Sequence, residues 1–385
     1  MSFQSPTYQL SGTHLVHGDR GPGTEVAPSV SVTSPFRIVS HGDPKGHGAM
    51  DPEKHIYSRY SQDVTSRVEQ ILSKVNHGYA VTYASGLAAV FSALVHFKPK
   101  RIAISRGYTG CHGAISTYTK GRFADTPIVG LDDEFQEGDL CWLESPLHPT
   151  GESRNIQYYA DKIHAVGGKL LVDSTLGPPP LQYPFKWGAD CVLHSGIKYF
   201  AGHSDLFCGI LIVRTEDERK QLWHDRAHMG NIMGSMDSWL LIRSLRTMHL
   251  RVSRQSGKWH GTPIVPEGQE YDGIPGGVIT KVWHSSLQET DGDGFNPSVQ
   301  MEGGFNAYFS LLLSKEEYAE KLPHSLEHFH VPATSLGGVE SLAQQYIRVD
   351  PKENPLLVSL SIGVEEVEDL KNDLRRALVE ISKGV

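Results

Sequence analysis

Short apolar segments alternate with amphipathic segments through the middle of this chain. From 63 to 75 the apolar positions recur at intervals of three and four residues, which predicts a helix with one buried face. We expect further helices at 87–97 and 158–166, and strands at 80–83, 102–105, 141–143, 170–172, 192–193 and 210–213. This alternation favours an α/β fold in which helices cover both faces of a mostly parallel sheet.

The pattern changes along the chain and divides it into three regions. Residues 1–48 are rich in Gly, Pro, Ser and Thr and predict an extended N-terminal arm. Residues 49–250 hold the alternating segments, and residues 251–385 predict a smaller α+β C-terminal domain. The elements expected in that smaller domain are strands at 307–313 and 356–362 and a last helix at 367–381.

One long helix is predicted from Asp237 to Val252, where large apolar residues again recur at helical spacing. The same segment carries Arg243, Arg246 and Arg251. We expect this charged face to be solvated or to form ion pairs, because arginine is rarely buried without a partner.

Composition excludes several classes of function. A net charge of −8 over 385 residues argues against a nucleic-acid or membrane partner, since both favour a basic face. No apolar run approaches the ~18 residues of a membrane span, and the N-terminus lacks the apolar core of a signal peptide. The four cysteines and 20 histidines show no metal-ligand spacing. We expect a cytoplasmic protein with buried free thiols, no metal, and a small-molecule substrate.

Lys198 is the most informative candidate for chemistry. It follows an apolar strand at 191–193, and Ser195 precedes it by three residues. A lysine amine at a strand end, near a hydroxyl that can bind phosphate, suits Schiff-base chemistry with pyridoxal 5'-phosphate. A lysine in a loop is more commonly only solvated, so this prediction depends on the neighbouring strand ends.

Three other strand ends carry residues that suit the same cofactor. The amides of Gly86 and Leu87 open a helix and can bind a phosphate, although many helices begin with Ser-Gly. Asp173 is at a position where aspartate commonly caps a turn, but its carboxylate can also bind a protonated pyridine nitrogen. Tyr108 can stack on a cofactor ring or serve only in packing. Because ligands bind at the carboxyl ends of parallel strands, these residues are expected to converge.

These motifs resemble the cystathionine γ-synthase/γ-lyase family, which comprises Cys/Met-metabolism enzymes dependent on pyridoxal phosphate. The resemblance runs from about Tyr57 to the C-terminus, and its segments are Tyr57-Ser58-Arg59, Ser85-Gly86-Leu87-Ala88-Ala89, Ser195-Gly196-Ile197-Lys198-Tyr199 and Ser335-Leu336-Gly337-Gly338. It implies fold type I, with Lys198 and Tyr108 catalytic and Asp173 bound to the pyridine nitrogen. It also implies that Tyr57 and Arg59 reach the phosphate of a partner subunit, in a homotetramer built from dimers with shared sites.

The departures from the family pattern concern mainly the substrate. His148 replaces an asparagine that bonds the cofactor's phenolic oxygen, and its charge is expected to vary near neutral pH. Ser359 stands where the family has a carboxylate-binding arginine, and Arg348 is a candidate to replace it. Thr334 occupies a position that is often acidic in members acting on cystathionine, and Ser335 is a further candidate for substrate binding.

The resemblance implies a reaction on an amino acid with a γ leaving group. Our first hypothesis is γ-replacement on an O-acylhomoserine-type substrate by a thiol or carbon nucleophile, through a vinylglycine-type intermediate. A γ- or β-lyase acting on cystathionine or a cysteine conjugate is the second. The departures also leave open a non-catalytic relative that binds pyridoxal phosphate, or a substrate whose carboxylate is absent or bound elsewhere.

Overall fold

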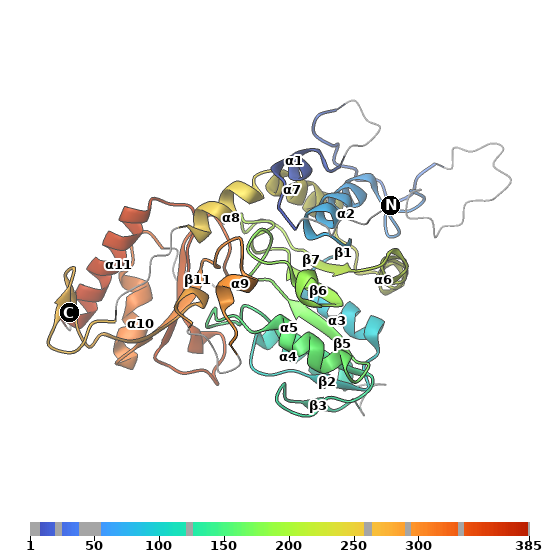
Figure 1. The fold of residues 1–385 in the computed structure, drawn as a ribbon. Helices are drawn as coiled ribbons and strands as arrows, with labels where there is room; N and C mark the ends of the chain where they lie inside the picture. Colours follow the sequence, from blue (N-terminus) through green and yellow to red (C-terminus); the bar gives the residue numbers. More distant parts are fainter. Residues whose placement is uncertain are drawn as a thin grey trace.

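The computed structural model describes residues 8–19, 25–37, 55–120, 126–257, 264–288, 294–329 and 335–383. Figure 1 shows two sheet-based parts side by side, with the N-terminal two thirds of the chain in one and the C-terminal third in the other. No helix in the described ranges is both long and apolar enough to cross a membrane.

The larger part is built on a seven-stranded sheet with the order β1-β7-β6-β5-β4-β2-β3. Only β7 runs antiparallel to its neighbours, so the sheet is mostly parallel, as predicted. The strands are β1 (Tyr79–Tyr83), β2 (Arg101–Ala103), β3 (Ile128–Val129), β4 (Asp139–Glu144), β5 (Lys169–Asp173), β6 (Cys191–Ser195) and β7 (Gly209–Val213). Every residue of β4 and β7 is buried, which fits continuous apolar strands covered on both faces.

Helices cover the two faces of this sheet through separate apolar clusters. On one face lie α3 (Gly86–Phe97), α4 (Thr109–Thr119) and α6 (Glu216–Met229). On the other lie α2 (Asp63–Asn76), α5 (Ile156–His164), α7 (Ser235–Leu245) and the short 3₁₀ turn η1 (Pro184–Trp187). The predicted helices at 63–75, 87–97 and 158–166 are confirmed, whereas α4 and α6 were not predicted.

The smaller part has a core of its own around an antiparallel sheet of order β10-β11-β13-β12. Its strands are β10 (Ile279–Trp283), β11 (Tyr308–Leu313), β12 (Leu342–Gln345) and β13 (Leu357–Ser361), and a two-stranded ribbon joins β8 (Glu270–Tyr271) to β9 (Ile274–Pro275). Its helical elements are η2 (Ser285–Leu287), α9 (Pro297–Gln300), α10 (Glu316–Ser325), η3 (Tyr346–Arg348) and α11 (Val367–Ser382). The predicted strands and last helix are confirmed, while the limits 48 and 250 of the three regions stay predictions.

The long helix expected from Asp237 to Val252 is two helices, α7 and α8 (Met248–Ser256). Thr247 breaks the helix with φ −113° and ψ 4°. The prediction of a solvated or ion-paired face is wrong for Arg251, which is 7% exposed and donates to the carbonyls of Tyr199, Phe200 and Ser244. Arg251 thus holds the turn after Lys198 against α8 through backbone oxygens.

The N-terminal segment is not only an extended arm. Residues Gly12–His17 form α1, and Leu15 of this helix is fully buried in the core shared with α2. Residues 25–37 run without regular helix, and there Trp239 of α7 donates to the carbonyl of Pro28. The composition concealed α1, because glycine and histidine are weak helix formers and only one residue of this helix is buried.

Candidate active site

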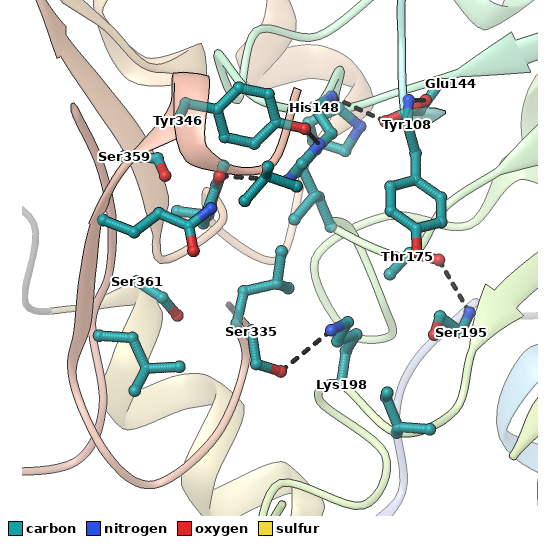
Figure 2. A pocket seen from close by; sticks show the side chains of 18 of the residues that line it. Tyr108, Glu144, His148, Thr175, Ser195, Lys198, Ser335, Tyr346, Ser359 and Ser361 are labelled. Atoms are coloured by element: carbon teal, nitrogen blue, oxygen red, sulfur yellow. Dashed lines mark hydrogen bonds between the residues drawn. The ribbon is translucent and has the colours of Figure 1, made fainter. Parts of the chain in front are cut away.

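A pocket lies where the carboxyl edge of the large sheet meets one face of the small sheet (Figure 2). Strand ends of the large sheet contribute Tyr108, Glu144, Asp173, Ser195 and Lys198, so the predicted convergence is observed for four predicted residues, Tyr108, Asp173, Ser195 and Lys198. Gly86 and Leu87 do not line the pocket themselves, although Gly86 lies next to Ser195. The remaining lining residues come from nearby loops and from the smaller part: Pro146, His148, Thr175, Leu176, Ile197, Tyr308, Ser335, Leu336, Leu342, Ala343, Gln344, Tyr346, Val349, Ser359 and Ser361.

Lys198 lies in the turn that follows β6, and its amine points into the pocket. Nζ donates to Ser335 Oγ at 3.0 Å, so a residue of the smaller part orients a lysine of the larger one (Figure 2). Burial lowers the pKa of Lys198 to about 8. A substantial fraction of this amine is therefore uncharged near neutral pH, which a nucleophile or a general base requires.

One end of the pocket has the features of a phosphate site. Ser85 caps α3 by accepting the N–H of Ala88, and the amides of Gly86 and Leu87 have no acceptor within the helix. A methyl group at Gly86 would lie 3.1 Å from Ser195 Oγ, so the helix start and this hydroxyl face the same small space. Thr175 Oγ1 accepts the N–H of Ser195 at 2.8 Å and fixes the end of β6.

Asp173 ends β5 and is 6% exposed. Its Oδ1 accepts the N–H of Thr175 at 3.0 Å. Burial raises the pKa of Asp173, and the bonds from Thr175 lower it only in part. A cationic ring N–H would stabilise a buried carboxylate in this position.

Glu144, at the end of β4, joins two loops of the site. Its Oε2 accepts the backbone N–H of Tyr108 and its Oε1 accepts that of His148, both at 2.8 Å. Burial raises the pKa of Glu144, and the nearby charge of Asp173 raises it further. The carboxyl therefore orients the aromatic residues of both loops, and Tyr108 itself remains 42% exposed at the pocket.

His148 is enclosed by two tyrosines of the smaller part. Its Nε2 lies 3.2 Å from the hydroxyl of Tyr308, and its Nδ1 lies 3.1 Å from that of Tyr346 (Figure 2). Burial, aided by the charge of Lys198, lowers the pKa of His148 to about 3. The expectation that its charge varies near neutral pH is therefore wrong. Both ring nitrogens are engaged by tyrosines, so a bond to a cofactor oxygen would require one of them to be released.

Only some of the other predicted site residues line the pocket. Ser335 and Ser359 line the pocket, whereas Arg348 is directed to Glu320 at 3.5 Å and does not line it. Tyr57 is 41% exposed, and Arg59 donates to the carbonyl of Ala227. Thr334 lies outside the described residues. The reach of Tyr57 and Arg59 into a partner subunit stays a prediction.

Sequence reasoning missed several lining residues. Thr175 had a signal, because it is a hydroxyl residue two positions after Asp173 at a strand end. Ser361 had one too, because with Ser359 it alternates with apolar residues in one strand. Gln344 belongs to a strand of sequence Leu-Ala-Gln-Gln that periodicity does not identify. Tyr308 and Tyr346 had no signal apart from their residue type.

The residues present fit pyridoxal phosphate. Ser195 lies close beside Gly86 at the start of α3, so its hydroxyl and the helix amides can bind the same phosphate. The buried carboxyl of Asp173 suits the pyridine nitrogen, and the amine of Lys198 suits the aldehyde. The apolar Ile197 also lines the pocket beside the lysine.

Comparison with known proteins agrees with this geometry. The model of the family described as "Cys/Met metabolism PLP-dependent enzyme" matches residues 12–379. Cystathionine gamma-synthase/O-acetylhomoserine (thiol)-lyase of Bacillus subtilis is 27% identical over 390 residues, covering 95% of this chain and 94% of that protein. Cystathionine gamma-lyase of the same organism is 26% identical over 393 residues, covering 96% and 99%.

Solved structures show the same fold. The crystal structure of cystathionine gamma synthase from Xanthomonas oryzae pv. oryzae superimposes with a TM-score of 0.82 at 24% identity, and the match covers 99% of this chain and 100% of that one. The match spans both sheets and the described helices. It establishes a fold type I architecture for the part of the chain that the structure describes.

Proposed function

Because the chain belongs to the Cys/Met-metabolism family of enzymes dependent on pyridoxal phosphate, we propose that it catalyses γ-replacement on an O-acylhomoserine-type substrate with a thiol or carbon nucleophile. The observation that carries the proposal is the state of Lys198, a buried amine with a pKa lowered to about 8 that points into the pocket. Such an amine can both accept and release a proton near neutral pH.

Each proposed role belongs to a residue of the pocket. Bound pyridoxal phosphate supplies the electron sink that makes the substrate Cα acidic. Asp173 keeps the ring nitrogen protonated, while Ser195 and the amides of Gly86 and Leu87 hold the phosphate. Lys198 Nζ would take the proton from Cα and deliver it to the cofactor carbon that is bonded to the substrate nitrogen. The amine, neutral again, would then take a proton from Cβ, which allows the γ substituent to leave. Tyr108, exposed at the same pocket, assists proton transfer and packs against the ring.

The Bacillus subtilis synthase/thiol-lyase, which is aligned over 94% of its length, supports the replacement branch, although its similarity is no greater than that of the gamma-lyase. The test is incubation of the holoenzyme with O-acetylhomoserine, with and without a small thiol, followed by amino-acid analysis. We expect a new thioether amino acid only when the thiol is present. Formation of 2-oxobutyrate and ammonia in both mixtures would contradict replacement.

A lyase is the second candidate, supported by the comparable similarity to cystathionine gamma-lyase. Its signature is release of a thiol and a 2-oxo acid from cystathionine or a cysteine conjugate. In both reactions Lys198→Ala abolishes turnover, because no other lysine lines the pocket among the described residues. We also propose that the chain forms a homotetramer of dimers in the cytoplasm, and sedimentation of the holoenzyme tests the assembly.

A further inference from the structure

One wall of the pocket is a face of the small sheet. Gln344 of β12 pairs with Ser359 of β13, and Ser361 of β13 pairs with Tyr308 of β11. Residues two apart on a strand share a face, so these four side chains line the pocket together. In Figure 2, Ser359 and Ser361 lie across the pocket from Ser195, with Lys198 between them.

This wall carries no positive charge. Lys198 is the sole lysine or arginine among the described residues that line the pocket, and it is committed to the cofactor. His148 stays neutral, because burial lowers its pKa to about 3. Two carboxyl groups, those of Glu144 and Asp173, line the same pocket. An anion at this wall meets no cation among the described residues of the same chain to compensate the loss of its hydration, and that loss is costly in a buried site.

Most polar groups of the wall already have partners. The hydroxyls of Tyr308 and Tyr346 bond His148, and Ser361 Oγ accepts the N–H of Gly337 at 3.0 Å. In contrast, Gln344 Oε1 is shielded from solvent and has no hydrogen-bond partner in the described part of the chain. Whichever way its amide is turned, Gln344 offers one acceptor and one NH₂ donor. A buried polar atom left without a partner favours a ligand that completes it.

Building on the proposed function, we infer that the pocket takes substrates whose carboxyl group is an amide rather than a free carboxylate. A carboxamide is neutral and offers both a donor and an acceptor, so it complements Gln344 on both sides. A carboxylate can only accept, and its charge has no cationic partner among the described residues of this wall. An ester is neutral but has no donor. It can accept a hydrogen bond from the NH₂ group of Gln344 but cannot donate one to the side-chain oxygen.

The test uses unreactive ligands, so that binding is measured without turnover. Norleucinamide, norleucine methyl ester and norleucine share a side chain without a leaving group. Each is titrated into the full-length holoenzyme, and displacement of Lys198 by the ligand amine is followed by the visible absorbance of the cofactor. The amines of the amide and the ester are weaker bases than the amine of norleucine, so each affinity is expressed for the neutral-amine form of the ligand. On that scale we expect the amide to bind at least ~10-fold more tightly than the free acid, a factor that corresponds to about 1.4 kcal/mol, with the ester between them.

The outcomes separate this inference from the proposed function. Equal or tighter binding of norleucine overturns the amide preference and leaves the proposed reaction in place. If none of the three ligands changes the absorbance, amine exchange at Lys198 fails, and both proposals are wrong.

Two variants test the wall directly. Gln344→Leu removes the donor and acceptor at similar volume, and we expect the amide to lose its advantage over the ester. Ser359→Arg introduces a cation opposite Gln344, and we expect the ratio of amide to acid affinity to reverse. Gln345→Leu is the matched control, because the amide of Gln345 donates to the carbonyl of Pro355 and does not line the pocket. Each ratio is measured within one preparation, so partial unfolding of a variant does not alter it. An unchanged ratio in Gln344→Leu overturns the role of Gln344.

Discussion

Lys198 Nζ donates a hydrogen bond to Ser335 Oγ at 3.0 Å, and this bond crosses between the two sheet-based parts of the chain. The lysine is therefore oriented by a residue that lies 137 positions further along the sequence. Since the bond uses a proton of the amine, it favours the charged form of Lys198. Burial acts in the opposite direction and lowers the pKa to about 8.

Removal of this bond should lower the pKa of Lys198 further. In Ser335→Ala the ammonium loses an acceptor, and a hydrogen bond to a charged group contributes about 1.5–3 kcal/mol. Because 1.36 kcal/mol equals one pKa unit, we expect the pKa to fall by at least about one unit. The pH dependence of cofactor uptake by the apoprotein measures this, because only the neutral amine reacts. An inflection unchanged from wild type would contradict the prediction, and Ser325→Ala, a half-buried serine of α10 outside the pocket, serves as control.

Glu144 should make the apoprotein less stable as pH rises from about 4 to neutrality. Its folded pKa is raised by burial, so the unfolded chain ionises first and stability is lost through that range. Glu144→Gln is neutral at every pH and removes this contribution. We therefore expect the stability of wild type relative to Glu144→Gln to fall between about pH 5 and pH 8, as measured by urea unfolding. A constant difference would contradict the raised pKa, and the exposed Glu368→Gln is the control.

For His148 we expect stability to change with pH in the opposite direction, so that it falls as the pH is lowered. Its folded pKa is about 3, while an unfolded histidine titrates near 6.5. Between these two pKa values only the unfolded chain binds the proton. The free energy of unfolding of the wild type therefore falls by up to about 1.4 kcal/mol for each pH unit of acidification. His148→Asn lacks this contribution, and urea unfolding from about pH 7 to pH 5 should show a flatter profile for it. Parallel profiles would show that His148 is protonated in the fold. His324→Asn is the control, because His324 is exposed to water in the folded chain.

The sequence predicted the cofactor end of the site better than the substrate end, for a physical reason. Parallel strands bring their carboxyl ends to one edge, so Asp173, Ser195 and Lys198 can be placed from strand positions alone. Gln344 lies in β12 of the other sheet and Tyr346 begins the 3₁₀ turn η3 that follows it, and both reach the pocket through packing between the two parts of the chain. Contacts between distant parts of a chain do not produce a repeating pattern of apolar residues in the sequence, so periodicity cannot predict them.

The same distinction explains the errors in the fold. Helices with one apolar face, such as α2, could be predicted because their buried residues recur every three or four positions. The burial of Arg251 depends on the carbonyl groups of residues 199 and 200, which become its neighbours only in the folded chain. The break at Thr247 interrupts a segment whose apolar residues keep the helical spacing on both sides. Arg348 was expected near the pocket, but it is directed away from the pocket toward Glu320.

The start of α3 provides a direct test of the phosphate site. A methyl group added at Gly86 would lie 3.1 Å from Ser195 Oγ and 3.4 Å from its Cβ, in the space between the helix amides and this hydroxyl. Gly86→Ala should therefore weaken pyridoxal phosphate binding by about 10-fold or more, measured by titration of the apoprotein. Gly113→Ala is the matched control, because a Cβ at this position in α4 meets nothing within 4 Å. We expect the control to bind normally and to gain up to about 1 kcal/mol in stability. Equal affinity in the two variants would mean that the phosphate does not bind between Gly86 and Ser195.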